Sequence, residues 1–131
     1  MPKRSNKEEV DRILIVDDDP ATLLALPALL KTHFPDTAIQ TAINADVALA
    51  WVRDYRYRLV LLDVRMPGMN GLAFLRQARD SLGAAHVIVM SGAIDEGLRA
   101  EAIETGAHGF LEKPVFPQTL IETIEAIFKK E

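Results

Sequence analysis

The chain contains no cysteine, which excludes disulfide bonds and thiolate metal centres. No apolar run is long enough to cross a bilayer, and the N-terminus lacks the pattern of a signal peptide. The formal net charge of −4 gives no electrostatic basis for binding nucleic acid. From these absences we expect a cytoplasmic protein that by itself binds neither a membrane nor nucleic acid.

The sequence does contain enough apolar residues for one folded domain. It has 131 residues, of which 49% are hydrophobic, so a single domain with a real core is the natural interpretation. Residues 1–10 are polar with mixed charge, and we expect them to form a flexible N-terminal arm. Residues 11–131 are then the domain itself.

Short apolar runs alternate with helical patterns along the whole domain. We expect strands at residues 12–16, 38–42, 59–62, 86–90 and 109–112. We expect helices at residues 20–33, from 44 or 46 to about 55, 70–80, 95–105 and 117–128. Alternation of this kind predicts an α/β fold in which helices cover both faces of a parallel sheet. Ligands of such sheets bind at the carboxyl ends of the strands.

Chemically reactive side chains stand where four of these strands end. The first strand runs into three acids in "ILIVDDDP", and the third ends on Asp63. The fourth ends on Ser91, and the fifth ends on Lys113. Carboxylate oxygens suit Mg²⁺, and a carboxylate can also act as a nucleophile that forms an acyl phosphate. A lysine and a hydroxyl group neutralise and bind phosphoryl oxygens. The pattern therefore indicates phosphoryl transfer at a magnesium site.

Four motifs in order resemble the response-regulator receiver domain of two-component signalling. They are "ILIVDDDP", "LVLLDVRMPGMNG", "VIVMSGA" and "GAHGFLEKPV". The resemblance extends over roughly residues 12–129. It implies the flavodoxin-like (βα)5 fold of the CheY-like superfamily, in which a five-stranded parallel sheet has the strand order 2-1-3-4-5.

The resemblance also implies a role for each acid at the strand ends. Asp63 matches the phosphoacceptor. Asp17 and Asp18 match the acidic pair that binds Mg²⁺ (or Mn²⁺) together with Asp63 and the backbone carbonyl of Arg65. Asp19 is an extra acid at a variable position, and we favour a helix N-cap over a metal ligand for it.

Further residues match the family's phosphoryl-binding and switch positions. Ser91 and Lys113 would bind the phosphoryl group, although Ser91 could instead bond only to its own loop. Phe110 matches the switch aromatic, and core packing is the alternative or additional role. The Lys113–Pro114 peptide bond is expected to be cis. The side chain of Arg65 lies at a variable position near the path of attacking water, so we hypothesise that it tunes the lifetime of the acyl phosphate.

By resemblance, the domain receives a phosphoryl group from a phosphohistidine of a sensor histidine kinase or a histidine phosphotransfer protein. It would be a signalling domain and not an enzyme with turnover. Its output surface would comprise the fourth helix, the fifth strand and the fifth helix, and would contact an output domain or a second copy. The apolar stripe of the last helix either faces the core or forms a dimer surface; it comprises Leu120, Ile121, Ile124, Ile127 and Phe128.

Three other classes compete with this interpretation. An aspartyl-nucleophile phosphohydrolase carries the motif D-x-D-x-[TV] after its first strand. Asp17 and Asp19 have this spacing, but Ala21 occupies the position that requires Thr or Val. A flavin-binding flavodoxin needs a phosphate loop, and "DDDP" would repel a phosphate in the absence of a cation. A pseudo-receiver would work without phosphorylation, and the complete acidic set argues against it.

Overall fold

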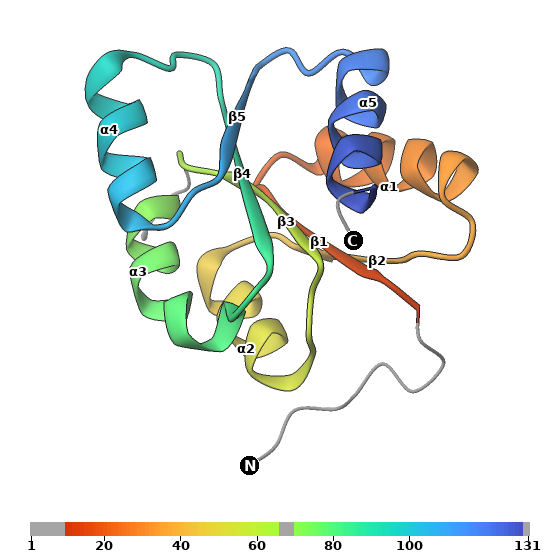
Figure 1. Ribbon diagram of the computed structural model, residues 1–131, viewed down its shortest axis with the longest axis horizontal. Helices are drawn as coiled ribbons and strands as arrows, with labels where there is room; N and C mark the ends of the chain where they lie inside the picture. Colours follow the sequence, from red (N-terminus) through yellow and green to blue (C-terminus); the bar gives the residue numbers. More distant parts are fainter. Residues whose placement is uncertain (1–9, 66–69, 130–131) are drawn as a thin grey trace.

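The computed structural model describes residues 10–65 and 70–129 (Figure 1). Within these residues, five strands alternate with five helices along the chain. The predicted N-terminal arm, residues 1–10, lies outside the described residues except for its last residue. The strands are β1 (Arg12–Val16), β2 (Ala38–Ala42), β3 (Leu59–Asp63), β4 (His86–Ser91) and β5 (Gly109–Glu112). The helices are α1 (Pro20–His33), α2 (Ala45–Asp54), α3 (Gly71–Leu82), α4 (Glu96–Thr105) and α5 (Pro117–Phe128).

The strands form one parallel sheet with the order β2-β1-β3-β4-β5. This order confirms the predicted flavodoxin-like fold. The chain moves outward from β1 to β2, then returns to the other side of β1 to place β3. The switch in direction therefore lies between β1 and β3, and ligands of open α/β sheets bind at such a point.

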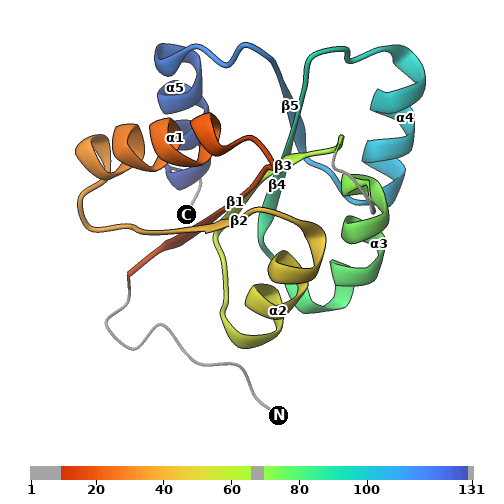
Figure 2. The ribbon, with the colours of Figure 1, turned by 180° about the vertical axis from the view of Figure 1, so that it is seen from behind.

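Apolar side chains on the two faces of the sheet form two separate cores. Alternate residues of a strand point to opposite faces, and the central strands are apolar on both. One core joins the sheet to α2, α3 and α4. The other joins it to α1 and α5 (Figure 2). Helix packing on both faces thus leaves the carboxyl edge of the sheet as the place where polar groups gather.

Two strands are one residue longer than the sequence pattern predicts. Asp63 pairs with Met90 in the β3–β4 ladder, and Ser91 pairs with Glu112 in the β4–β5 ladder. A polar residue ends an apolar pattern in sequence, but the ladder continues as long as the neighbouring strand offers partners. As a result, the expected acceptor and the expected switch hydroxyl are the last residues of two strands.

The helix ends follow the expected capping chemistry. Of the two predicted caps for α2, Asn44 is the one used: its side chain accepts the N–H of Val47 at 2.9 Å. Gly106 ends α4 with a φ of 125°, a conformation that favours glycine.

The apolar stripe of α5 faces the core. Leu120, Ile121, Ile124 and Ile127 are all buried within the chain, and Phe128 is half-buried beside Phe34. Of the two interpretations, the structure supports ordinary core packing. The stripe gives no support to a dimer surface.

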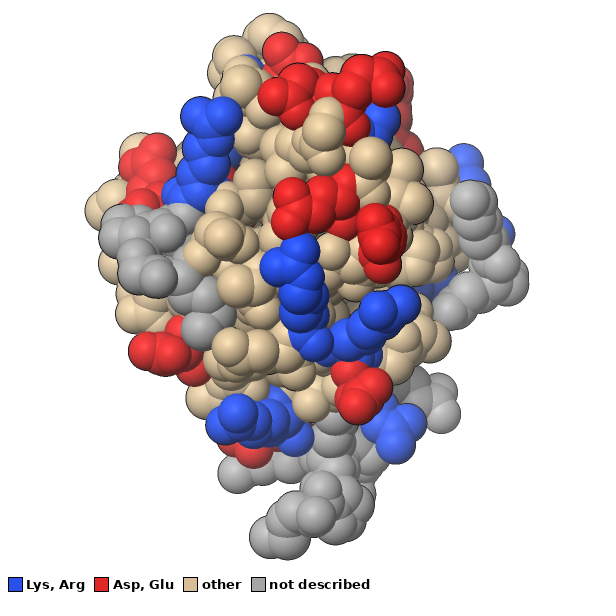
Figure 3. Space-filling model, turned by 90° about the vertical axis from the view of Figure 1, so that its left-hand side faces the viewer, with Lys and Arg blue, Asp and Glu red and all other residues tan. Residues whose placement is uncertain are grey.

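The outer side of α3 and α4 has charges of both signs. Figure 3 shows acidic and basic side chains interspersed on this side of the molecule. Arg76 of α3 and Glu101 of α4 form an ion pair of 2.7 Å across it. Among the described helices, none combines the length and the apolar character needed to cross a membrane.

Close packing at Gly71 fixes the start of α3 against the end of β3. The N–H of Gly71 donates to the carbonyl of Val64 at 3.0 Å. A Cβ atom at this position would lie 2.5 Å from the carbonyl oxygen of Asp63 and 2.6 Å from the Cα atom of Val64. Both contacts are with backbone atoms, so a methyl group fits only if the helix or the strand moves.

We therefore predict that Gly71→Ala destabilises the domain by about 1–3 kcal/mol, the usual cost of overpacking. Equilibrium unfolding in urea measures this loss. Gly97→Ala in α4 is the matched control, because its Cβ would lie 3.5 Å from Asp95 Oδ1, an ordinary contact. That change should stabilise the helix by about 0.4–1 kcal/mol. Equal midpoints for the two variants would contradict the prediction.

Candidate functional site

Three carboxylates from two adjacent strands meet at the carboxyl edge of the sheet. Asp17 and Asp18 directly follow β1, and Asp63 is the last residue of β3. One oxygen from each lies within 4.8 Å of the others. Asp17 is fully buried and Asp63 is 4% exposed, whereas Asp18 is half-buried. We call these three residues the acidic cluster.

Lys113 approaches the acidic cluster from β5. Its backbone N–H donates to the carbonyl of Ser91 at 2.8 Å, which extends the β4–β5 ladder by one residue. Its Nζ atom lies 2.9 Å from Asp17 Oδ2 and 3.4 Å from Asp63 Oδ2. The following bond, Lys113–Pro114, is cis, the isomer that the resemblance implies. One ammonium group thus bridges two carboxylates that are 46 residues apart in the sequence, Asp17 and Asp63 (63 − 17).

The second oxygen of each bridged carboxylate accepts a backbone hydrogen bond. Asp17 Oδ1 accepts the N–H of Asp19, and Asp63 Oδ1 accepts the N–H of Arg65, both at 3.0 Å. These bonds orient both carboxylates, because each uses one oxygen for the backbone and the other for Lys113. The site is therefore pre-oriented before any ligand binds.

Burial and mutual repulsion set the ionisation of this site. Burial raises the pKa of Asp63 above its usual value; the negative charge of Asp17 adds to this effect, while the Arg65 N–H and Lys113 oppose it. Burial disfavours the charge of Lys113, but its bonds to Asp17 and Asp63 outweigh burial and raise the pKa of the lysine. The site thus combines three carboxyl groups with a single ammonium group.

The donor set fits a hard divalent cation. All three side chains offer carboxylate oxygens, which Mg²⁺ and Mn²⁺ prefer, and their atoms are close enough to share one ion. The presence of three carboxyl groups beside a single ammonium group is a further electrostatic reason for a cation to bind. The cluster could thus hold a divalent metal ion.

Asp19 lies outside the acidic cluster and caps α1. Its Oδ1 accepts the N–H of Ala21 at 3.0 Å, and its Oδ2 accepts the hydroxyl of Thr22 at 3.3 Å. This arrangement confirms the N-cap that the sequence favours. In a phosphohydrolase of the D-x-D type, Asp17 would be the nucleophile and Asp19 the second acid, with its carboxyl group available for proton transfer. The geometry of Asp19 therefore weakens that alternative.

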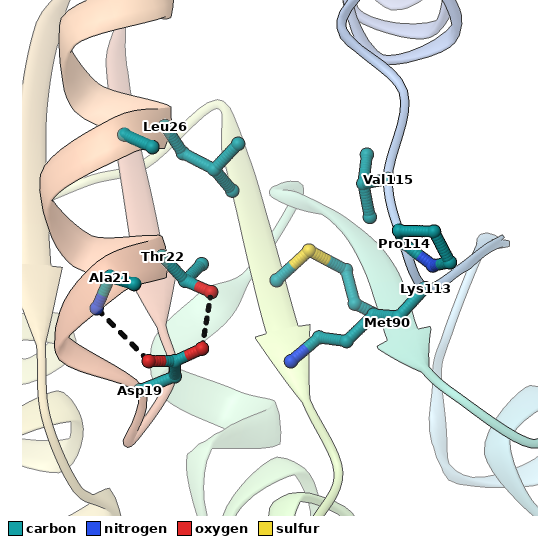
Figure 4. A pocket seen from close by; sticks show the side chains of 9 residues that line it. Asp19, Ala21, Thr22, Leu26, Met90, Lys113, Pro114 and Val115 are labelled. Carbon is teal, nitrogen blue, oxygen red and sulfur yellow. Dashed lines mark hydrogen bonds between the residues drawn. The ribbon is translucent and has the colours of Figure 1, made fainter.

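A hollow of about 370 Å³ adjoins the acidic cluster. Figure 4 shows Asp19 and Thr22 of α1 on one side of it, and Met90 and Lys113 on the other. The remaining lining residues are Ala21, Ala25, Leu26, Pro114 and Val115. Lys113 lines the hollow and also pairs with two carboxylates of the acidic cluster, and its amine points from the β5 side toward α1 (Figure 4).

The other predicted site residues lie at different depths in the protein. Ser91 is buried, and its hydroxyl oxygen accepts the N–H of Ala93 at 3.3 Å, so in this state it bonds to its own loop. Arg65 is exposed and contributes its backbone N–H to Asp63. Phe110 is half-buried and packs against the core under α4. Sequence reasoning missed Arg99, whose guanidinium lies over the Phe110 ring, because no spacing rule links these two residues.

Comparison with known proteins decides the family. The sequence profile of the response regulator receiver domain matches residues 13–125, nearly the whole chain. The chain belongs to the response regulator receiver family. Receiver domains are signalling domains of two-component systems, so membership of this family supports a role in phosphorelay signalling in general.

Curated relatives of this receiver differ in length. It is 36% identical over 118 residues to Protein PilH of Pseudomonas aeruginosa, with 88% of this chain and 96% of PilH covered. It is 34% identical over 119 residues to the DNA-binding response regulator MtrA of Mycolicibacterium smegmatis, where coverage is 91% and 51%. The chain thus spans about half of MtrA, and only 26% of the response regulator PleD of Caulobacter vibrioides.

Solved receiver structures share the fold closely. A CheY-like receiver domain protein from Methanospirillum hungatei superimposes with a TM-score of 0.85 at 29% identity, covering 92% of this chain and 96% of that one. The receiver domain of NtrX from Brucella abortus gives a TM-score of 0.80 at 31% identity, with coverage of 91% and 99%. The fold predicted from the sequence motifs is therefore that of the family.

We predict that Lys113→Gln destabilises the receiver at neutral pH by roughly 1–3 kcal/mol, because two buried carboxylates lose their shared cation. The loss should be smaller than for a fully buried pair, since the lysine side chain is 29% exposed. It should also shrink as the pH falls toward the raised pKa of Asp63, because protonation removes one of the repelling charges. Urea unfolding at two pH values measures both effects.

The exposed Lys31 provides the control for this measurement. Lys31→Gln removes the same charge from the end of α1, and we expect a change within about 0.5 kcal/mol, as for other surface substitutions. A Lys113→Gln penalty that is the same at neutral and acidic pH would show that the lysine does not act through the acidic cluster.

Proposed function

We propose that this receiver accepts a phosphoryl group on Asp63 from a phosphohistidine of a partner protein. The observation that supports this most strongly is the convergence of three carboxylates and Lys113 on one point of the sheet edge. Asp63 Oδ1 accepts a backbone hydrogen bond from Arg65. Asp63 Oδ2 accepts no backbone hydrogen bond from the described residues, and the Lys113 ammonium lies beside it. Oδ2 is therefore the nucleophile in this proposal.

The transfer is an in-line displacement at phosphorus. Asp63 Oδ2 forms the new O–P bond, and the P–N bond to the partner's imidazole breaks. The bonding electron pair stays on the imidazole nitrogen, which takes a proton from solvent. The product is an aspartyl phosphate, and water later hydrolyses it to restore the carboxylate.

A divalent ion has a defined place in this proposal. Asp17, Asp18 and Asp63 would hold Mg²⁺ or Mn²⁺, and the backbone carbonyl of Arg65 would be a further ligand. When bound, the ion supplies positive charge that neutralises phosphoryl oxygens. Lys113 would supply a second positive charge beside Asp63 Oδ2. The ammonium also keeps Asp17 oriented through its bond to Oδ2.

The response to phosphorylation would begin at Ser91. Its hydroxyl exchanges the bond with the Ala93 N–H for a bond to the phosphoryl group, and Phe110 then changes position. The face formed by α4, β5 and α5 is the output surface, which contacts an output domain or a second copy of the receiver. The domain turns over no separate substrate in this scheme. A cytoplasmic location, expected from the sequence, belongs to the proposal.

Intact-protein mass after incubation with Mg²⁺ and a small acyl phosphate donor tests the proposal. We expect one added phosphoryl group on the wild type, and none on Asp63→Asn or without magnesium. Asp18→Asn should slow the reaction at least tenfold, because it removes one of the three carboxylates that bind the ion.

Asp19→Asn is the matched control, since it removes a neighbouring charge but keeps a good N-cap for α1. This variant should react at the wild-type rate. If the wild type gains no phosphoryl group and also fails to bind beryllofluoride, a mimic of the phosphoryl group, the chain is a pseudo-receiver and the proposal is wrong.

The side chain of Arg65 remains the candidate that tunes phosphate lifetime. It is exposed at the rim of the acidic cluster, two residues after the acceptor, where a guanidinium can pair with phosphoryl oxygens. We predict that Arg65→Ala changes the rate of dephosphorylation severalfold and leaves beryllofluoride binding within about twofold. Decay of the mass adduct measures the rate, with Arg53→Ala on the exposed face of α2 as the control. Identical decay in wild type and Arg65→Ala would end this hypothesis.

A further inference from the structure

A cation from α4 covers the ring of Phe110. The guanidinium carbon of Arg99 lies 4.5 Å from the centroid of that ring. Phe110 is half-buried, and its other side packs against the core that joins the sheet to α2, α3 and α4. Among the described residues, Arg99 forms no ion pair with a carboxylate, so the contact is not a by-product of a salt bridge. The ring is the group that the guanidinium engages.

Phe110 lies on the same face of the sheet as Ser91. It pairs with Val89 in the β4–β5 ladder, and Ser91 is two residues beyond Val89 on β4. Residues two apart in a strand share a face, so Ser91 and Phe110 are diagonal neighbours on the face that α4 covers. Any movement of Ser91 toward Asp63 therefore changes the space next to the Phe110 ring.

The backbone beside Ser91 has room for such a movement. A Cβ atom on Gly92 would meet nothing within 4 Å, so the β4–α4 loop is loosely packed at this point. Among the residues that the structure describes, the Ser91 hydroxyl bonds only to its own loop: it accepts the Ala93 N–H at 3.3 Å and contacts the Ala93 carbonyl at 3.5 Å. The ring of Phe110, in contrast, is held from outside the sheet by α4. Phe110 is thus restrained by α4 as well as by the core, whereas the Ser91 hydroxyl bonds to its own loop.

We propose that Arg99 is a positioning residue that holds Phe110 in the unphosphorylated arrangement and so sets how readily the output face responds. This inference rests on the function proposed above. Arg99 lies far along the chain from the acidic cluster and touches no reacting atom. It acts through the aromatic ring and thereby joins α4 to β5.

The physical basis is a contact that exists in one arrangement only. A guanidinium over an aromatic face is attracted by the ring quadrupole, and the attraction is lost when the ring moves away. A ligand that favours the arrangement in which the Phe110 ring has moved must therefore break this contact. The energy needed lowers the apparent affinity of the protein for that ligand. By reciprocity, removal of the contact raises the affinity of the acceptor site for a phosphoryl mimic.

The test is beryllofluoride affinity in the presence of Mg²⁺, measured by fluorescence or calorimetry. We expect Arg99→Gln to bind roughly two- to fivefold more tightly than the wild type, in line with an exposed cation–π contact. Arg99→Lys, which keeps a cation, should remain closer to the wild type. Arg53→Gln removes the same charge from α2 and should bind as the wild type does.

A double-mutant cycle separates the ring contact from general charge effects. Phe110→Leu keeps an apolar side chain on β5 but removes the π face. In that background, Arg99→Gln should no longer change beryllofluoride affinity. A direct readout accompanies it: the Arg99 side-chain protons should show an upfield ring-current shift in NMR spectra, lost in Phe110→Leu and on addition of beryllofluoride.

The outcomes distinguish this inference from the function on which it rests. If the wild type does not bind beryllofluoride, the proposed function fails and the inference falls with it. If the wild type binds but Arg99→Gln has the affinity of Arg53→Gln, only the inference is overturned. An equal effect of Arg99→Gln with and without the aromatic ring also overturns it.

Discussion

The bridge that Lys113 makes between Asp17 and Asp63 is the interaction on which the rest of the site depends. Two buried carboxylates from neighbouring strands repel each other, and burial makes that repulsion stronger. The Lys113 ammonium offsets part of this repulsion, and the hydrogen bond from the Arg65 N–H restricts rotation of the Asp63 side chain. Three carboxyl groups beside a single ammonium group favour a divalent ion. A stabilising requirement of the fold and a chemical requirement of the site are thus met by the same residues.

Parallel strands make this arrangement possible and connect it to a distant surface. The strands end at one edge, so β1, β3, β4 and β5 each contribute a reactive group to one place. The same strands extend beneath the helices, and alternate residues of β4 and β5 face α4. Ser91 therefore lies at the carboxyl edge of the sheet, near the acidic cluster, and is also a diagonal neighbour of Phe110 under α4. In the proposed mechanism, a change at Asp63 would reach α4 through β4 and β5, where Arg99 contacts Phe110.

Many features followed from local rules. The alternation of apolar runs and helical patterns predicted each strand and helix, because helices and buried strands have different periods and lengths. Asp19 was predicted to be an N-cap from its place before a proline, and it is. The predicted ends of β3 and β4 were one residue short. The apolar pattern stops at a polar side chain, whereas backbone pairing continues as long as the adjacent strand offers a partner. From the sequence, the apolar stripe of α5 could face either the core or a dimer partner. In the structure it faces the core, because α1 and the sheet cover it.

The sequence alone specified which groups are present and at which strand ends they stand, because these depend on residues that are neighbours along the chain. The sheet order and the identity of the acceptor came from motifs that resemble a family. Folding was needed to establish which carboxylate oxygen meets Lys113 and that Arg99 covers Phe110. Those contacts join residues far apart in sequence, and side-chain direction across strands and helices has no local signature.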